Sequence, residues 1–187
     1  MLQERKLPVL DKNSYRRHFD FPVKNYYKAI GFDFEKEAFE KTGLEFIRRY
    51  NKDVSKLQLM PYAKESLVLF KKQGFKQYII SARNEKDLKK ELNQFQILDF
   101  FEAIAGLADN YAAGKTERAA ELIKTFEAEP KECLLIGDTS HDGETAESLG
   151  CDCVLISDGH HPPEKLKPFN YPVYKSLNVF TENIISH

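Results

Sequence analysis

Residues 134–142 read Leu134-Leu135-Ile136-Gly137-Asp138-Thr139-Ser140-His141-Asp142, and this stretch decides the fold. Its apolar start indicates a buried strand, and Gly137 permits another segment to approach the backbone closely. The strand delivers the carboxylate of Asp138, and a second acid, Asp142, follows four residues later. Two hard oxygen ligands beside a polar turn suit Mg²⁺, which retains several waters. Alternatively, Asp142 caps the helix that follows and ends at Gly150, and both interpretations stay open.

The pattern of apolar residues changes near residue 60 and divides the chain into two parts. Residues 1–58 are predicted to be helical throughout, with Asp11 as an N-cap. In residues 59–187, Pro61 is predicted to open a helix that Gly74 closes, and short apolar runs then alternate with helical patterns. This alternation predicts a mostly parallel sheet covered by helices. The apolar runs are residues 75–82, 101–107, 133–137, 151–157 and 171–174.

Composition and charge narrow the classes of protein. With 28 basic and 29 acidic residues, the chain has a formal net charge of only −1 and no net positive field to attract nucleic acid or an acidic membrane surface. No apolar run approaches the roughly 20 residues that span a bilayer. Three cysteines make an odd count, two of them (Cys151 and Cys153) lie in an apolar run, and the N-terminus does not resemble a signal peptide. We therefore expect a reduced, cytoplasmic protein that binds neither nucleic acid nor membranes.

Ser81 and Lys115 are further candidates, because ligands of parallel sheets bind at the carboxyl ends of the strands. A serine at a strand end can donate a hydrogen bond to a phosphoryl oxygen, and a lysine at a helix start can stabilise anionic charge. Taken singly, each residue is also explained as a turn hydroxyl or a solvated surface lysine. Gly114-Lys115-Thr116 does not end a P-loop, because Asp109 stands where that motif needs a glycine.

The segments around Ser81, Lys115, Asp138 and Asp142 resemble three motifs of the haloacid dehalogenase-like hydrolases, in their phosphoglycolate phosphatase-like branch. Ser81 is similar to the phosphate-binding residue of the second motif, and Lys115 to the lysine of the third. Asp138 and Asp142 resemble the paired acids of the fourth motif, Gly-Asp-Thr-x-x-Asp. The resemblance implies a doubly wound, Rossmann-like parallel sheet in an α/β core domain (59–187), with a helical cap domain (1–58).

The resemblance also implies an activity and a role for each candidate residue. The activity is Mg²⁺-dependent hydrolysis of a small phosphorylated metabolite through an aspartyl-phosphate intermediate. Ser81 and Lys115 would hold the phosphoryl oxygens as catalytic residues, while Asp138 and Asp142 would hold the metal. Substrate-binding residues are expected at Arg17 and Lys24 on the cap and at Asn84 beside the second motif; basic residues on helices are otherwise solvated.

One family motif has no counterpart among these 187 residues. It is an apolar strand followed by Asp-x-Asp-x-Thr, which supplies the nucleophilic aspartate. Asp11 is a poor substitute, because Pro8 would remove a ladder donor from a central strand, and no threonine follows Asp33-x-Glu35. We expect the first strand to be absent, the cap to be truncated at its N-terminus, and the isolated chain to be inactive.

The resemblance implies that the absent strand lies between the strands that end at Asp138 and at Ser81. Its loss leaves two sheet edges whose backbone groups cost about 1–3 kcal/mol each if they are buried unsatisfied. We expect a repair: a closed gap, a strand borrowed from another chain in a homo-oligomer, or a segment lost through a misassigned gene start or cleavage. The competing class of function is a non-catalytic or partner-complemented protein that binds phosphate or metal.

Zinc is a further alternative, with Cys151-x-Cys153 and His160-His161 as ligands. Alternation along a strand would point both sulfurs to the same face and into the core, which disfavours a zinc site.

Overall fold

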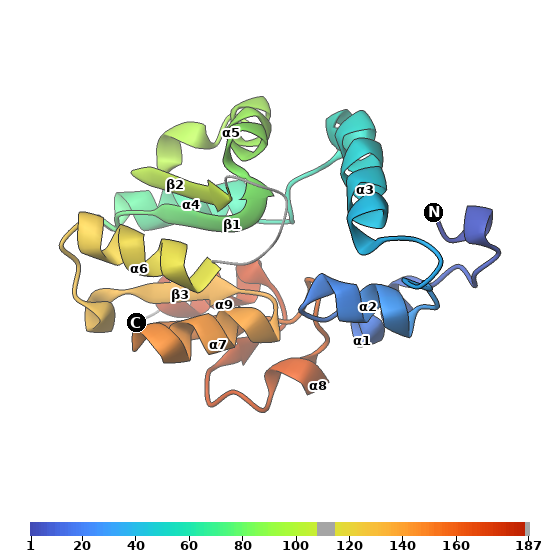
Figure 1. Ribbon diagram of the computed structural model, residues 1–187. Coiled ribbons are helices and arrows are strands. Elements are labelled where there is room, and N and C mark those ends of the chain that lie inside the picture. Colours follow the sequence, from blue (N-terminus) through green and yellow to red (C-terminus); the bar gives the residue numbers. More distant parts are fainter. Residues whose placement is uncertain (108–114, 186–187) are drawn as a thin grey trace. The chain divides into compact units, whose positions relative to one another are not determined.

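The structure is a computed structural model that describes residues 1–107 and 115–185, without the side chains of Lys115 and Ile185. The chain forms two compact units, Met1–Gln58 and Leu59–His187 (Figure 1). We refer to them as the helical unit and the sheet unit. None of the helices in the described residues is long and apolar enough to cross a membrane.

The helical unit is built from short helices joined by irregular segments. Asp11 caps the first α-helix, because its Oδ1 accepts a hydrogen bond of 2.6 Å from the backbone N–H of Ser14. The expectation of helix throughout was too broad: the chain turns at Pro22, and Gly31 adopts a φ of +100° that favours glycine. The elements are η1 (Gln3–Arg5), α1 (Lys12–His18), α2 (Val23–Ala29), α3 (Phe39–Asp53) and η2 (Val54–Lys56).

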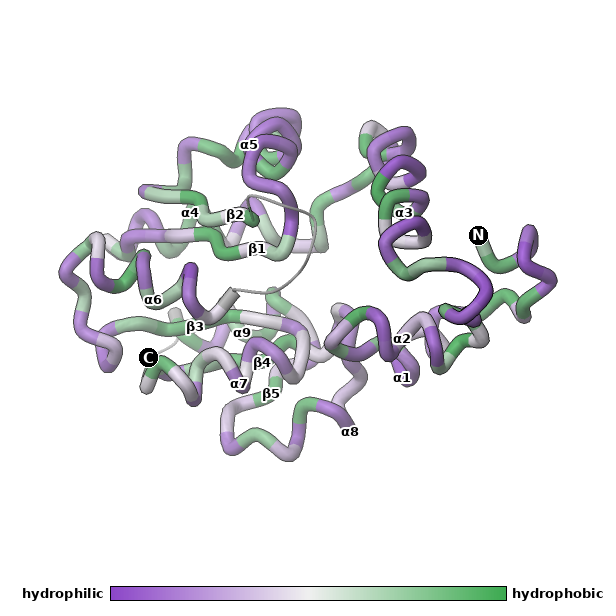
Figure 2. The backbone as a smooth tube through the Cα atoms, in the orientation of Figure 1, coloured by the Kyte–Doolittle hydropathy of each residue, from purple (hydrophilic) through white to green (hydrophobic). Residues whose placement is uncertain are grey.

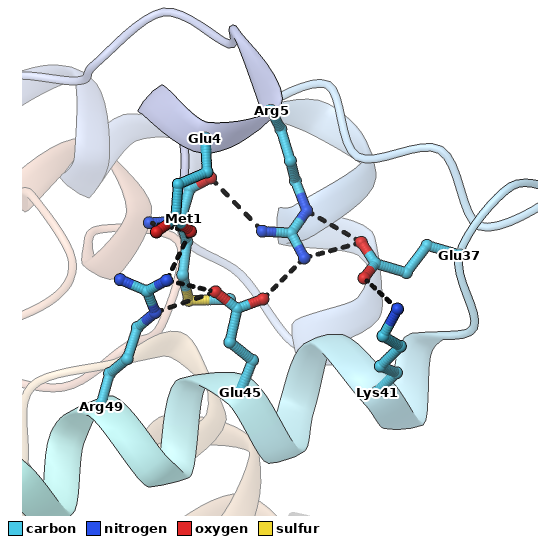
Figure 3. Close-up of polar contacts among 7 residues, drawn as sticks. All are labelled: Met1, Glu4, Arg5, Glu37, Lys41, Glu45 and Arg49. Atoms are coloured by element: carbon cyan, nitrogen blue, oxygen red, sulfur yellow. Dashed lines mark hydrogen bonds and ion pairs between the residues drawn. The ribbon is translucent and has the colours of Figure 1, made fainter.

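A network of charged side chains fastens the first residues of the chain to α3 (Figure 3). The Arg5 guanidinium donates to Glu37 at 2.8 Å and to Glu45 at 2.7 Å. Arg49, one turn after Glu45, donates to Glu45 at 2.8 Å and also to Glu4. The Arg5 side chain also lies 5.0 Å from the centre of a buried ring, that of Phe32. The network therefore joins three segments that are distant in sequence.

The sheet unit alternates helix and strand, as the sequence predicts. The five strands found among its described residues are all paired in parallel with their neighbours. Figure 2 shows the hydrophilic helix α5 beside the more hydrophobic strand β2. The elements are α4 (Ala63–Lys72), β1 (Tyr78–Asn84), α5 (Glu85–Gln94), η3 (Leu98–Phe100), β2 (Ala103–Leu107), α6 (Lys115–Thr125), η4 (Pro130–Glu132), β3 (Leu134–Gly137), α7 (Ser140–Leu149), β4 (Asp152–Ile156), α8 (Pro163–Leu166), β5 (Val173–Tyr174) and α9 (Leu177–Ile185).

The strands form two separate sheets. One has the order β1-β2 and the other β3-β4-β5, so among the described residues β1 and β3 each pair with a strand on one side only. In β3, Leu134 and Ile136 are 44% and 40% exposed. The described residues therefore do not close the gap within the chain, whereas a strand borrowed from another chain and a lost segment stay predictions.

Helices cover both faces of the larger sheet and connect it to the smaller one. Val154 and Ile156 of β4 pack with Phe70 of α4 and Phe180 of α9. Side chains of the opposite face, including Leu155, pack against α7 and α8. Helix α6 packs on β1 and β2 and also against α7. Helix packing, rather than a strand ladder, therefore holds the two sheets in one unit.

Candidate functional site

The end of β3 brings together the two acids that the sequence singles out. Asp142 is 2% exposed, and its Oδ2 accepts hydrogen bonds from the backbone N–H groups of Asp138 (3.0 Å) and Thr139 (2.9 Å). The Thr139 hydroxyl donates to the same oxygen at 2.7 Å. Thr139 and Asp142 form a capping box at the start of α7, so the capping interpretation of Asp142 is confirmed. Its role as a metal ligand stays a prediction.

Gly137 is needed for this arrangement. A Cβ atom built on Gly137 would overlap the Asp142 carboxylate. The carboxylate can reach the backbone of Asp138 only because position 137 has no side chain. The close approach that the sequence predicts at this glycine is therefore present, and the group that approaches is the second acid of the same stretch.

The loop after β4 closes on Asp138. The backbone N–H of His160 donates to Asp138 Oδ2 at 2.7 Å, and the N–H of His161 donates to the Asp138 carbonyl at 3.1 Å. A Cβ atom built on Gly159 would overlap the Asp138 carboxylate. Both acids thus lie against a glycine, and each accepts hydrogen bonds from backbone N–H groups.

His161 is a structural residue of the site that the sequence analysis treated only as a zinc ligand. Its side chain is fully buried, and its Nδ1 accepts a hydrogen bond of 2.9 Å from the backbone N–H of Ser140. A ring nitrogen that accepts carries no proton, so the proton of the neutral ring is on Nε2. The described residues contain no group of three or more His, Cys, Asp and Glu side chains that could hold a metal ion. Its position in the sequence could have indicated a role in the site, since His161 follows the carboxyl end of β4, where ligands of parallel sheets bind.

Ser81 lies where β1 stops pairing regularly with β2. The register is regular as far as Ile80 opposite Ala105 and then shifts before Asn84. Ser81 Oγ accepts a hydrogen bond of 3.1 Å from the backbone N–H of Arg83. Asn84 caps α5, because its Oδ1 accepts from two backbone N–H groups of the first turn. The phosphate-binding role of Ser81 and the substrate-binding role of Asn84 stay predictions.

Lys115 begins α6, but its side chain lies outside the described residues, as do Asp109 and Gly114. The neighbouring Thr116 lies beside α7, since its Oγ1 is 3.3 Å from Oγ1 of Thr145. The start of α6 is therefore next to the helix that carries Asp142. The predicted role of the Lys115 ammonium stays a prediction.

Arg17 and Lys24 belong to the helical unit. Arg17 is exposed on α1, and its guanidinium donates to Ser14 Oγ at 3.3 Å. The Lys24 ammonium lies 5.8 Å and 5.9 Å from the ring centres of Phe34 and Phe39, within the range of cation–π attraction. Lys24 thus has a local structural explanation, and the substrate-binding role of both residues stays a prediction.

The residues at the end of β3 fit Mg²⁺ by their chemistry. Asp138 and Asp142 offer carboxylate oxygens, the hard ligands that Mg²⁺ prefers. Because Mg²⁺ usually retains several waters and is completed by substrate phosphate, a pair of protein carboxylates is a sufficient set. When bound, the ion would place positive charge beside phosphoryl oxygens.

The sequence is similar to a known family and to curated proteins. A family model for haloacid dehalogenase-like hydrolases matches residues 1–156. The phosphoglycolate phosphatase of Aquifex aeolicus is 31% identical over 127 residues, which are 66% of this chain and 56% of that protein. The phosphoglycolate phosphatase of Pseudomonas syringae pv. syringae is 27% identical over 128 residues, 67% of this chain and 47% of that protein. The chain thus spans about half the length of these two curated relatives.

Solved structures share the fold. A haloacid dehalogenase-like family protein of Streptococcus pneumoniae superposes with a TM-score of 0.77 at 20% identity, covering 97% of this chain and 86% of the other. Protein tyrosine kinase A of Mycobacterium tuberculosis gives 0.78 at 19% identity, covering 97% and 85%. Identities this low show the fold alone, and the Rossmann-like α/β fold predicted from the sequence is confirmed. With the family match over residues 1–156, the resemblance seen in the motifs is also confirmed: the chain belongs to the haloacid dehalogenase-like hydrolase family.

Proposed function

We propose that this chain provides the sheet and the cap of a Mg²⁺-dependent hydrolase that acts on the phosphate monoester of a small metabolite. The observation that carries the proposal is the pair of carboxylates at the end of β3: that of Asp142 accepts hydrogen bonds from two backbone N–H groups, that of Asp138 accepts one, and each lies against a glycine. Such preorganisation suits a site whose charges must keep their positions during a reaction. The phosphoglycolate phosphatases among the relatives support the substrate class.

The residues of the chain have separate roles in this proposal. Asp138 and Asp142 would hold the metal ion. Ser81 would donate a hydrogen bond to a phosphoryl oxygen, and Lys115 would place its charge beside the same group. Arg17, Lys24 and Asn84 would contact the rest of the substrate. The reduced, cytoplasmic setting expected from the sequence stays part of the same proposal.

The isolated chain is proposed to be inactive. Its 187 residues contain no Asp-x-Asp-x-Thr sequence, so no acid matches the family nucleophile. Metal, serine and lysine can stabilise charge but cannot replace the group that forms the covalent intermediate. Removing the nucleophile of a covalent mechanism costs roughly 10⁶-fold in turnover.

A second candidate is a partner-complemented protein, and the two separate sheets favour it. The free edges of β1 and β3 present backbone groups that another strand could pair with. The exposed side chains of Leu134 and Ile136 would be covered by such a strand. If a second copy supplies the strand, the chain is a homo-oligomer.

Hydrolysis and metal binding test the first proposal together. We expect the purified chain to hydrolyse para-nitrophenyl phosphate near the blank rate with Mg²⁺, while calorimetry detects weak Mg²⁺ binding. Asp138→Asn should remove that binding. The matched control is Asp152→Asn, because Asp152 is an exposed acid at the opposite end of the neighbouring strand. A fusion with an N-terminal apolar strand ending in Asp-x-Asp-x-Thr should restore turnover.

Two results would contradict this reading of the site. Robust hydrolysis by the 187-residue chain, abolished by Asp138→Asn, would place a nucleophile within the chain, and Asp11 and Asp33 would be tested next. Unchanged Mg²⁺ binding by Asp138→Asn would remove the metal assignment.

Light scattering over a range of concentrations tests the second candidate. We expect association that Ile136→Lys weakens, because a charge at the free edge of β3 opposes strand addition. Val179→Lys is the control, since Val179 is exposed to a similar extent on α9. A chain that stays monomeric at every concentration would exclude a strand borrowed from a second copy.

A further inference from the structure

Two of the three cysteines meet where β3 and β4 begin. Leu134 pairs with Asp152 in the parallel register, so the preceding residues, Cys133 and Cys151, are cross-strand neighbours. The backbone N–H of Asp152 donates to the Cys133 carbonyl at 3.1 Å, which fixes the two backbones side by side. The two thiols also influence each other electrostatically, since each contributes to the pKa of the other, although burial is the largest cause of both shifts. The strand register therefore places two cysteines, 18 residues apart in sequence, beside each other.

The local backbone allows a disulfide at this position. Neighbouring strands lie about 4.8 Å apart, and the Cα atoms of a disulfide are about 4.4–6.8 Å apart. Both cysteines lie just outside their strands. Cys133 follows the short helix η4, and Cys151 follows Gly150, whose φ of +69° ends α7. The paired residues of the two strands begin one residue later, at Leu134 and Asp152.

The two thiols differ in their access to solvent. Cys133 is half-buried, and its Sγ donates a weak hydrogen bond of 3.4 Å to the Glu129 carbonyl. Cys151 is 6% exposed, and burial raises its pKa to about 11. Burial also raises the pKa of Cys133. Both thiols are therefore protonated near neutral pH, and Cys133 is the sulfur that a dissolved oxidant reaches first.

We propose that Cys133 and Cys151 are a redox modification site, a dithiol that a small-molecule disulfide such as oxidised glutathione converts to an intramolecular disulfide. Cys133, after losing its proton to water, attacks one glutathione sulfur and releases the other as glutathione thiolate. Cys151 then loses its proton, attacks Cys133 Sγ and releases the second glutathione. The protein dithiol loses two electrons and two protons, and the oxidant becomes two glutathione thiols.

The consequence of the bond follows from what it encloses. The closed ring contains residues 134–150, which are β3, α7 and both candidate metal acids. Cross-linking this segment restricts the unfolded chain, so the oxidised protein should unfold at a higher temperature. This inference does not depend on the proposed hydrolase activity, because it rests on the thiols alone.

Peptide mapping of the whole chain tests the proposal. After incubation with oxidised glutathione, proteolysis without reduction should yield one linked peptide pair that contains Cys133 and Cys151. The same pair should form in Cys153→Ser and be missing from Cys133→Ser. Cys153 is a suitable control, because it lies on the same face of β4 as Cys151 but opposite Leu135 rather than a thiol. The wild-type melting temperature should rise by several degrees and return after reduction.

Three outcomes would overturn the proposal. One is a stable mixed disulfide on Cys133 that never closes, and another is a link that includes Cys153. The third is complete recovery of three free thiols after prolonged oxidation of the folded chain. The wild-type peptide map tests the disulfide by itself, so the test does not depend on whether every variant folds.

Discussion

At the scale of single residues, the acids at the end of β3 are positioned by the absence of side chains around them. Gly137 leaves room for the Asp142 carboxylate, and Gly159 leaves room for that of Asp138. The Asp142 carboxylate then accepts two backbone hydrogen bonds and the Asp138 carboxylate one, and a side chain at the glycine beside each acid would displace that acid. The two glycines are as necessary to the geometry as the acids themselves.

We expect Gly137→Ala to lower the free energy of unfolding by about 1–3 kcal/mol, because the displaced Asp142 would lose its buried hydrogen bonds. Gly43→Ala is the matched control. Gly43 lies inside α3 with nothing within 4 Å of an added Cβ atom, so alanine should be neutral or stabilise the helix by up to about 1 kcal/mol. Urea unfolding of both variants measures the difference. A harmless Gly137→Ala would show that Asp142 has another position of equal stability.

Much of this chemistry could be predicted from residue types and spacing. The N-cap at Asp11 and the pairing of Asp138 with Asp142 follow from local rules, since the partners are a few residues apart. The contributions of Gly159 and His161 could not be predicted, because they reach Asp138 and Ser140 across 21 residues of sequence. Contacts of that kind depend on how neighbouring strands place their following loops.

At the scale of elements, Arg5 is the central residue of the network that joins η1 to α3 (Figure 3). Its side chain is 21% exposed and contacts two carboxylates and an aromatic ring. We expect Arg5→Leu to cost about 2 kcal/mol, because it leaves partly buried Glu37 and Glu45 without their main partner. Lys56→Ala, which breaks an exposed ion pair with Asp53, should change stability little. Equal effects of the two variants in thermal unfolding would mean that the network is merely a surface feature.

The same network predicts a dependence on pH. The hydrogen bond from Arg5 lowers the pKa of Glu45 below its ordinary value of 4.5. A carboxylate with a lowered folded-state pKa contributes stability above its unfolded pKa and loses that contribution as the pH falls through the folded pKa. The difference in unfolding free energy between wild type and Glu45→Gln should therefore be present at neutral pH and disappear in acid well below pH 4.5. A difference that does not vary with pH would exclude the ion pair as its cause.

Element boundaries differ from the prediction for local reasons. Helix α4 begins at Ala63 rather than Pro61, because Tyr62 adopts a left-handed conformation with a φ of +67°. Strand β1 begins at Tyr78 rather than Phe75, which is 57% exposed. The apolar pattern identifies the elements, whereas their ends depend on single backbone angles and on which apolar side chains are buried in the folded chain.

At the scale of the whole chain, the parallel arrangement was predictable and the separation into two sheets was predictable only in part. Alternating strands and helices dictate parallel pairing, since each crossover returns the chain to the same end of the sheet. The gap between β1 and β3 was expected, but its repair was not found in the described residues. The order in which strands pair depends on long-range packing, which no local pattern records.

The two separate sheets have a consequence for the cooperativity of unfolding. Side chains of α4 connect them: Leu67 packs against the same buried cluster as Ile79 of β1 and Ile104 of β2, and Phe70 packs with Val154 and Ile156 of β4. We expect Phe70→Ala to raise the ratio of calorimetric to van't Hoff enthalpy above one, because the two sheets would then unfold in separate steps. Phe75→Ala is the control: Phe75 is a neighbouring phenylalanine with an exposed side chain, and its loss should leave the ratio unchanged. If the ratio stays the same for both variants, contacts other than Phe70 make the sheet unit melt as one. If only Phe70→Ala raises the ratio, a single aromatic ring decides whether the two sheets of the sheet unit unfold together or one after the other.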